Sequence, residues 1–216
     1  MTINNTAVCS QCGESTDVPV YSSMNVEEMP ELKAKVLDGS AFVWQCPHCG
    51  TLNLIQYQTL YHDPSEKMMV WLTRGSEELE EQVRATYSKL EGLDEYTMRF
   101  VDDAGSLIEK IKIFDAGLDD LAMEMTKYVT KLEICESRKE RAEDIMAAPF
   151  KFLKMSGPDN EITLAYPLDG KMEMVAIGFN VYEDCRGIIK RNTSIKETAA
   201  GFQVFTLPLS HWGIVI

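Results

Sequence analysis

The sequence lacks any long apolar run, and no stretch approaches the roughly 20 consecutive apolar residues that a membrane-spanning helix needs. Its first residues, Met1 to Asn5, have neither the basic region nor the apolar region that opens a secretory signal. Six cysteines in 216 residues are too few for a secreted scaffold held by many disulfides. We therefore expect a cytoplasmic protein with no membrane segment, whose thiols stay reduced unless a metal ion binds them.

Basic residues are also scarce: 21 lysines and arginines stand against 34 acidic residues, which gives a net charge of −13. A general nucleic-acid binder needs a positive surface that displaces counterions from phosphates, so nucleic acid is a disfavoured partner. The acid surplus is concentrated in residues 63–147, which hold 21 acidic and 12 basic side chains. A local basic cluster is available only at Arg186, Lys190, Arg191 and Lys196.

Familiar catalytic motifs are absent as well: the chain has no GxSxG, P-loop, HExxH or GxGxxG sequence. The remaining acid–base candidates are His62-Asp63 and the pairs Asp102-Asp103 and Asp119-Asp120. His62 and Asp63 lie in a predicted turn, where adjacent side chains diverge. The aspartate pairs open predicted helices, where capping accounts for them, with a second metal site or acid–base work as the alternative. No constellation of residues indicates an active site.

Two CxxC pairs form the clearest motif in the sequence. Cys9-Ser10-Gln11-Cys12 and Cys46-Pro47-His48-Cys49 are each followed by glycine, and 33 residues separate the two motifs. Two intervening residues let both sulfurs of a tight turn point at one centre. Two such turns therefore supply four sulfurs that can surround one ion in a tetrahedron. Such ligation favours Zn²⁺, with an iron centre second. We therefore predict a structural zinc site with Cys9, Cys12, Cys46 and Cys49 as ligands.

The residues around the cysteines suit such turns. Pro47 presets φ at the start of the second turn, and Gly13 and Gly50 can adopt positive φ, which lets N–H groups turn toward the sulfurs. Four protein sulfurs leave no open position for water, which argues against metal catalysis and for a role in folding. Two redox dithiols or free structural thiols are the alternatives. A thioredoxin-like dithiol opens a helix, however, whereas Cys46 leads into a predicted strand.

Three other candidate ligands or nucleophiles have simpler interpretations. Cys135 lies on the apolar stripe of a predicted helix, where a small buried side chain is expected. Cys185 follows Glu183-Asp184, and these acids oppose formation of a reactive thiolate. His48 lies between two ligands in the second turn, and we expect it to point away from the metal.

The periodicity of the apolar residues predicts an α+β protein in three segments. Residues 1–75 are predicted to form a zinc-ribbon-like antiparallel sheet, residues 76–147 a helical segment, and residues 148–216 a C-terminal β-rich segment. Strands are predicted at residues 17–21, 41–44, 52–61, 67–73, 150–153, 161–166, 172–179 and 202–207, and helices at 30–38, 76–90, 102–117, 118–135 and 184–195.

The helix predicted at 118–135 has the strongest apolar pattern. A heptad-like stripe runs along it, and two to three heptads favour packing within the domain over an intermolecular coiled coil. The stripe consists of Leu118, Leu121, Met125, Tyr128, Leu132 and Cys135.

The pairing of Cys46-Pro47-His48-Cys49 with Cys9-Ser10-Gln11-Cys12 resembles the CpXC family of bacterial and archaeal proteins, which is named for two Cys-Pro-x-Cys turns. The similarity covers about residues 5–130 and includes Tyr61-His62-Asp63-Pro64, the strand Lys67 to Leu72, Leu107 to Ile111 and Gly117 to Asp120. Ser10 stands where the family's first motif has proline, which leaves the ligands intact and makes the first turn less rigid. The family has no established activity, so the resemblance implies zinc-ribbon-like metal binding, with residues 1–147 as one CpXC-like domain.

The leading functional hypothesis is a cytoplasmic, non-enzymatic zinc-binding protein that acts as a protein-interaction or adaptor module. Its partner would be another protein or a second copy of the chain, bound by the acidic helices or the apolar stripe. The alternative is an enzyme with a site between the zinc sheet and the C-terminal strands that uses His62, Asp63 or Asp119-Asp120. A nucleic-acid-associated zinc ribbon is the weakest alternative. An exposed apolar patch favours the adaptor, and a pocket with perturbed carboxylates favours the enzyme.

Overall fold

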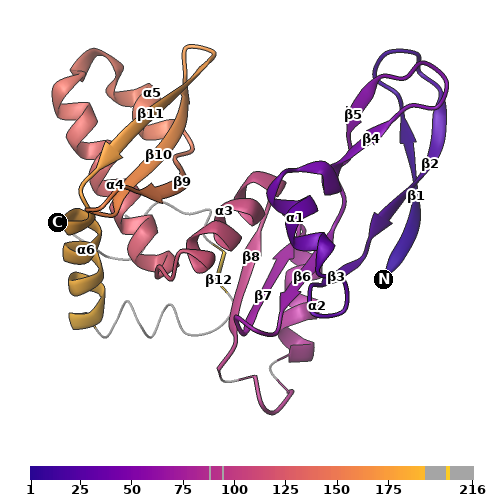
Figure 1. Ribbon diagram of the computed structural model, residues 1–216, viewed down its shortest axis with the longest axis horizontal. Helices are drawn as coiled ribbons and strands as arrows, with labels where there is room; N and C mark the ends of the chain where they lie inside the picture. Colours follow the sequence, from indigo (N-terminus) through magenta and orange to yellow (C-terminus); the bar gives the residue numbers. More distant parts are fainter. Residues whose placement is uncertain (88, 94, 193–202, 205–216) are drawn as a thin grey trace. The chain divides into compact units, whose positions relative to one another are not determined.

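The computed structural model describes residues 1–87, 89–93, 95–192 and 203–204, and the chain forms two compact units. The first unit holds Met1–Ile108 together with the short strand Gln203–Val204, and the second begins at Glu109. Helices and strands occur in both units (Figure 1), so the predicted α+β class is confirmed.

Two antiparallel hairpins carry the cysteine turns of the first unit. β1 (Thr2–Val8) pairs with β2 (Ser15–Tyr21), and β4 (Val43–Gln45) pairs with β5 (Leu52–Leu54). The antiparallel N-terminal strands are therefore present as expected. The sequence pattern missed β1, because nearly all of its residues are exposed and no apolar alternation marks the strand.

The other strands of the first unit form a five-stranded mixed sheet in the order β12-β8-β7-β6-β3. Only β6 and β7 are antiparallel; the other neighbouring pairs are parallel. All five residues of β7 are buried, as expected for a central strand that is covered on both faces. The strands are β3 (Ser23–Asn25), β6 (Thr59–Asp63), β7 (Met68–Leu72), β8 (Thr97–Val101) and β12 (Gln203–Val204).

Helices of the first unit pack against this sheet or connect its strands. Val83 of α2 packs against Trp71 and Phe100, and burial of these large side chains provides much of the local stability. The helical elements are α1 (Glu31–Leu37), the 3-10 turn η1 (Ser40–Phe42), α2 (Glu77–Tyr87) and α3 (Ala104–Asp115). α3 passes from the first unit into the second, because the division falls after Ile108.

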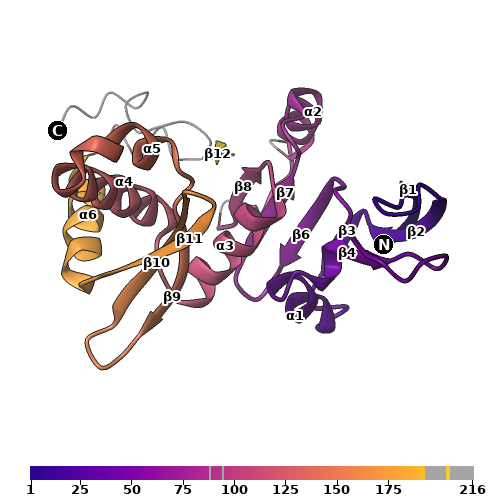
Figure 2. The same ribbon diagram turned by 90° about the horizontal axis from the view of Figure 1, so that it is seen from above.

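The second unit combines α4 with a three-stranded antiparallel sheet in the order β11-β10-β9 (Figure 2). Its elements are α4 (Asp120–Ser137), η2 (Lys139–Arg141), α5 (Ala142–Ala147), β9 (Lys151–Ser156), β10 (Glu161–Leu168), β11 (Lys171–Ile177) and α6 (Phe179–Arg191). α4 lies against α5 and α6, and Leu121 and Met125 of the predicted stripe are buried there. Leu118 of the stripe is also buried, whereas Tyr128 and Cys135 are only partly buried and Leu132 is exposed, so the stripe packs only over its first half. Over the described residues, no helix has the length and apolar character to cross a bilayer.

The strand predicted at Leu52–Tyr61 is wrong as a single element. Its residues alternate between exposed and buried as in one strand, so the sequence pattern cannot detect the interruption. Beyond β5, the N–H of Ile55 donates to the carbonyl of Phe42 at 2.9 Å. The ring of Tyr57 then packs against Phe42 with centroids 5.5 Å apart. Phe42 lies in the 3-10 turn η1, before β4 begins, so β5 ends at Leu54 for lack of a partner strand, and β6 begins at Thr59 in a different sheet.

Other element boundaries also differ from the sequence pattern. The strand predicted at Ala41–Trp44 begins only at Val43, after the 3-10 turn η1. β8, which carries the buried Arg99, was not predicted. The helix predicted at 184–195 begins at Phe179, with Gly178 as its N-cap. The helix ends at Arg191, earlier than predicted. The predicted helical positions beyond residue 192, and the strand predicted at 202–207 except for β12, lie outside the described residues.

Candidate metal centre

The two CxxC segments form the same kind of turn, one in each hairpin. In each turn the N–H of the glycine donates to the carbonyl of the first cysteine, at 3.0 Å for Gly13 and 2.8 Å for Gly50. Both glycines have a φ of 75°, a conformation that residues with a side chain rarely adopt. The positive φ predicted for these two positions is therefore confirmed, and it closes each turn behind its second cysteine.

The structure brings the four predicted ligands together. The sulfurs of Cys9, Cys12, Cys46 and Cys49 all lie within 4.8 Å of one another and could hold a metal ion. Across the two turns, Cys9 Sγ lies 3.6 Å from Cys49 Sγ, and Cys12 Sγ lies 3.7 Å from Cys46 Sγ. Four sulfurs at the usual zinc–sulfur distance in a tetrahedron would be separated by about 3.8 Å. The cross-turn spacings therefore fit one tetrahedral ion.

The cluster consists of free thiols rather than disulfides. Cys9 and Cys46 are buried, whereas Cys12 and Cys49 are exposed. His48 is exposed and does not join the cluster, as expected for a residue between two ligands. The donor set is thus four cysteine sulfurs, which suits a soft, tetrahedral ion such as Zn²⁺.

Asn53 ties the first turn to the second hairpin. Its Oδ1 accepts hydrogen bonds from the N–H of Ser10 at 2.9 Å and from the Ser10 hydroxyl at 2.8 Å. Its Nδ2 donates to the carbonyl of Thr51 at 2.9 Å and to Cys9 Sγ at 3.6 Å. Outer contacts of this kind orient metal ligands and offset the negative charge that four thiolates carry.

Ser10 helps to fix the first cysteine turn, which lacks the proline of the second turn. The sequence suggests a less rigid first turn, but the Ser10 N–H, which a proline would not have, bonds to Asn53. Asn53 itself left one signal in the sequence: it is a polar residue between Leu52 and Leu54, and the structure buries the asparagine while exposing both leucines. The sequence analysis did not identify Asn53 as part of the site.

The thiols of the cluster differ in their affinity for protons. Hydrogen bonds from the backbone of Cys12 and Gln11 lower the pKa of Cys9 to about 6. The backbone of Glu14 lowers the pKa of Cys12, but burial and the neighbouring thiols outweigh this effect and raise it to about 12. Hydrogen bonds from Thr51 lower the pKa of Cys49 as well, so two thiolates form readily while the Cys12 thiol keeps its proton. A divalent cation among the sulfurs would favour loss of that proton.

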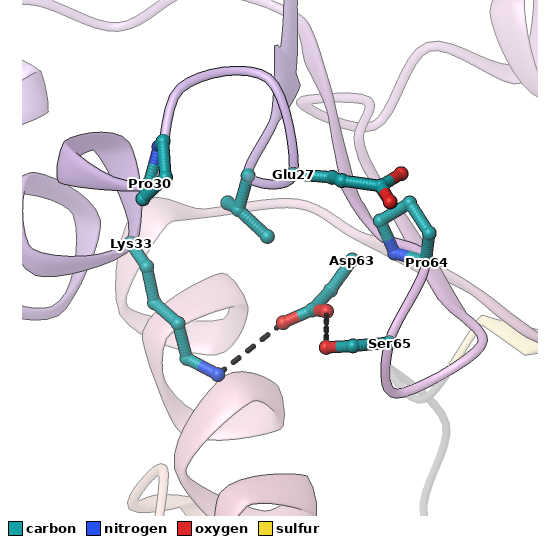
Figure 3. A pocket seen from close by; sticks show the side chains of 7 residues that line it. Glu27, Pro30, Lys33, Asp63, Pro64 and Ser65 are labelled. Atoms are coloured by element: carbon teal, nitrogen blue, oxygen red, sulfur yellow. Dashed lines mark hydrogen bonds and ion pairs between the residues drawn. The ribbon is translucent and has the colours of Figure 1, made fainter.

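Asp63 lies in a pocket of about 340 Å³ between α1 and the end of β6 (Figure 3). Lys33 Nζ lies 3.2 Å from Asp63 Oδ2, and the Ser65 hydroxyl donates to Asp63 Oδ1 at 2.6 Å. Burial would raise the pKa of Asp63, but the hydrogen bonds from Ser65 and Lys33 outweigh it and hold the pKa below its ordinary value. The arrangement favours an ionised carboxylate that closes a turn, not a general acid.

His62 does not pair with Asp63. The two are adjacent on β6 and therefore project to opposite faces of the sheet. The ring of His62 lies 5.7 Å from that of Tyr96, centroid to centroid, and burial lowers its pKa. The two side chains diverge as expected, but the predicted turn is wrong at these positions: His62 and Asp63 end the strand β6, and the turn begins at Pro64.

The other aspartates serve as helix caps and acceptors. Asp103 Oδ1 accepts from the N–H of Ser106 at 2.8 Å at the start of α3. Asp119 caps α4 by accepting from the N–H of Ala122 at 2.8 Å. Asp120 lies 3.2 Å from Lys110. Asp102 Oδ1 accepts from the N–H of Gly75 and the hydroxyl of Thr73.

The two remaining cysteines lie outside the cluster. Cys185 is buried, and burial raises the pKa of its thiol, which opposes reactivity. Cys135 is partly buried and donates to the carbonyl of Ala142 at 3.5 Å. In the basic cluster, Arg186 lies 3.6 Å from Glu183, Lys190 and Arg191 end α6, and Lys196 lies outside the described residues.

The fold and the site define a protein built on two antiparallel hairpins whose CxxC turns gather four thiols that could hold a metal ion. The model of the CpXC protein family matches residues 7–127, more than half of the chain, and the protein belongs to this family. The suspected family is thereby confirmed. No curated protein and no solved structure gives a significant match.

Proposed function

We propose that the four cysteines hold one structural Zn²⁺ ion and that the protein works in the cytoplasm as a non-enzymatic protein-interaction module. The observation that carries the zinc assignment is the sulfur cluster, with cross-turn spacings of 3.6 and 3.7 Å. Tetrahedral sites with four cysteine ligands are typical of structural zinc, whose coordination is complete without water. Binding of the ion would join two small hairpins that have little core of their own.

Exposed apolar side chains support an interaction function. Leu52 and Leu54 of β5 are 68% and 79% exposed, and Val43, opposite Leu54 on β4, is also exposed. Adjacent exposed apolar residues are typical of protein-interaction surfaces. The engagement of Asp63, Asp119 and Asp120 in turns, caps and ion pairs supports a non-enzymatic role. The cytoplasmic assignment is supported by six free thiols, which suit a reducing compartment.

Metal content and melting temperature test the zinc assignment. We expect one zinc per chain in the wild type, and much less in Cys49→Ser, which removes an exposed ligand without opening a cavity. A chelator should lower the melting temperature of the wild type and have little effect on the variant. Cys135→Ser is the matched control and should retain the wild-type zinc content. Retention of a full zinc complement and unchanged melting in Cys49→Ser would exclude the four-cysteine site, and iron in place of zinc would exclude the metal assignment.

The interaction function is tested by cross-linking the full-length protein in its native host and identifying what it contacts. We expect one protein, either a partner or a second copy, to cross-link reproducibly to the wild type and only weakly to Cys49→Ser. Equal cross-linking of the two forms would contradict an interaction that depends on the metal-bound hairpins.

A further inference from the structure

A groove of about 590 Å³ lies between the two hairpins of the first unit. One wall is β2, from Thr16 to Tyr21, and the other is β4 with Pro47 of the second cysteine turn. Trp44 and Pro19 also line it, which gives the groove aromatic and proline surfaces. Lys35 and Ser40 close the end that is distant from the cysteines. Both walls belong to elements that the cysteine cluster brings together.

The groove is bordered by strand edges that have no partner strand among the described residues. β2 pairs only with β1, and β4 pairs only with β5. In the β1–β2 pair, the bond from Ser22 N to Met1 O shows which residues face β1. Asp17 therefore directs its N–H and C=O to the outer edge, and Pro19, which has no N–H, directs only its C=O there. In the second hairpin, the bond from Cys46 N to Thr51 O likewise directs the backbone of Gln45 outward. Unpaired edges of this kind accept an additional strand.

Tyr57 shows how a polar group can join the two walls. Its hydroxyl donates to the carbonyl of Ala41 at 2.8 Å, just before β4. The same oxygen accepts a hydrogen bond from the backbone of Tyr21 at the end of β2. At the end of the groove distant from the cysteines, the Tyr57 hydroxyl therefore forms hydrogen bonds with backbone groups of both walls. Nearer to the cysteine turns, the groove is open. The backbone of a bound peptide could there form hydrogen bonds with the wall strands, as the Tyr57 hydroxyl does at the other end.

The ends of the groove carry opposite charges. Asp17 lies near the start of β2, close to the first cysteine turn, whereas Lys35 lies on α1 at the other end. Asp17 Oδ1 accepts from the hydroxyl of Thr6 at 3.0 Å, which holds the carboxylate on the hairpin. A peptide with a basic side chain near the cysteine turns and an acidic group near Lys35 would complement this pattern.

We propose that this groove binds an extended peptide segment of a partner protein, which adds to the edge of β2 as a third strand. The segment carries a basic residue opposite Asp17 and an acidic residue or terminal carboxylate near Lys35. Strand addition supplies affinity through backbone hydrogen bonds and specificity through alternate side chains. The proposal rests on the proposed interaction function and names the chemistry of its partner. A metal ion bound by the four cysteines would support this function, because it would fix the distance between the two walls of the groove.

A displayed library of random ten-residue peptides, selected against the zinc-loaded full-length protein, tests the proposal. We expect enriched sequences with alternating apolar residues and a basic residue toward one end. Synthetic peptides should lose affinity by about tenfold or more in Val43→Lys, which places a charge in the groove. Ile3→Lys is the matched control: Ile3 is an exposed, β-branched residue on β1 that does not line the groove, and this variant should bind like the wild type. Absence of enriched peptides, or equal binding to both variants, would overturn the proposal.

Backbone methylation of a selected peptide distinguishes strand addition from docking of side chains alone. Methylating one backbone nitrogen at a time should weaken binding by up to about tenfold at every second position, where the N–H faces β2. A loss without this period of two would overturn the strand geometry. Zinc content is measured on the same samples, so that failure of the zinc assignment is distinguished from failure of the groove. Full zinc content without peptide binding would reject the groove alone.

Discussion

Ser10 is the residue that distinguishes the first cysteine turn of this chain from the Cys-Pro-x-Cys pattern for which the family is named. A proline there would preset φ but could not donate to Asn53. Serine instead contributes two hydrogen bonds, from its N–H and its hydroxyl, to one buried oxygen. The first turn is therefore held by hydrogen bonds to Asn53 of β5 instead of by the rigid ring of a proline. Sequence analysis identified the departure at Ser10, and only the structure identified its partner.

Ser10→Pro should therefore weaken the site although it restores the family motif. The substitution leaves Asn53 Oδ1 buried without its two donors, a cost of about 1–3 kcal/mol. We expect faster zinc loss to a chelator and a lower melting temperature than in the wild type. Ser10→Ala keeps the N–H bond and should lie between the two. Slower zinc loss in Ser10→Pro than in the wild type would show that backbone rigidity matters more than the contact with Asn53.

Asp63 should make the stability of the first unit depend on pH. Its pKa is held below the ordinary aspartate value when folded, so its ionised form stabilises the fold above the unfolded pKa of about 4. This contribution is lost as the pH falls through the folded pKa. Asp63→Asn should therefore be less stable than the wild type at neutral pH, and the difference should shrink below about pH 4. Urea unfolding at several pH values measures this, and a difference independent of pH would contradict the assignment.

At the scale of elements, a buried ion-pair network joins α3 to α4 in the second unit. Lys127 Nζ lies 3.0 Å from Glu109 and 2.8 Å from Glu124, and Lys110 Nζ lies 3.0 Å from Glu124. Glu109 also accepts from the N–H of Phe152 at 2.7 Å, which joins β9 to the network. Burial alone would lower the pKa of Lys127, but Glu124 and Glu109 outweigh it and raise the pKa. The network therefore links α3, α4 and β9 within the second unit.

Lys127→Met should destabilise the second unit by about 3 kcal/mol, because Glu109 and Glu124 each lose one cation; Glu124 keeps Lys110, and Glu109 keeps Lys151 at 3.5 Å. Lys131→Met, one turn along the same helix, is the control. Lys131 is partly buried, donates to the carbonyl of Met146 and lies over the ring of Phe150 at 5.3 Å, so its loss should cost about 1–2 kcal/mol. Denaturant unfolding of both variants gives the comparison. An equal effect of the two substitutions would show that the network contributes nothing specific.

Apolar periodicity predicted the helices well and the strand pairings poorly. α4 buries the first half of its apolar stripe, which includes Leu121 and Met125, and such spacing is visible in sequence; farther along the helix Leu132 of the same stripe is exposed. The end of β5 cannot be detected in this way. Burial continues to alternate from Leu52 to Tyr61, although β5 pairs with β4 and β6 pairs with β7. The parallel pairing of β7 with β8 depends on residues distant in sequence, which local patterns cannot register.

At the scale of the whole molecule, the clustering of the four cysteines was predictable because CxxC spacing is a local property of each turn. The division into two units was not, because α3 crosses it with Leu107 and Ile111 both fully buried, and an apolar stripe gives no sign of a boundary. All four cysteines belong to the first unit. An ion held by them would therefore stabilise the fold of one unit by joining two hairpins that are separated in sequence.

X-ray absorption at the zinc edge of the purified protein tests this account most directly. We predict a single shell of four sulfur atoms at about 2.3 Å, with no nitrogen or oxygen ligand, as expected for a complete set of cysteine thiolates. A shell that includes a histidine nitrogen or a water oxygen, or a protein that binds no zinc, would contradict it.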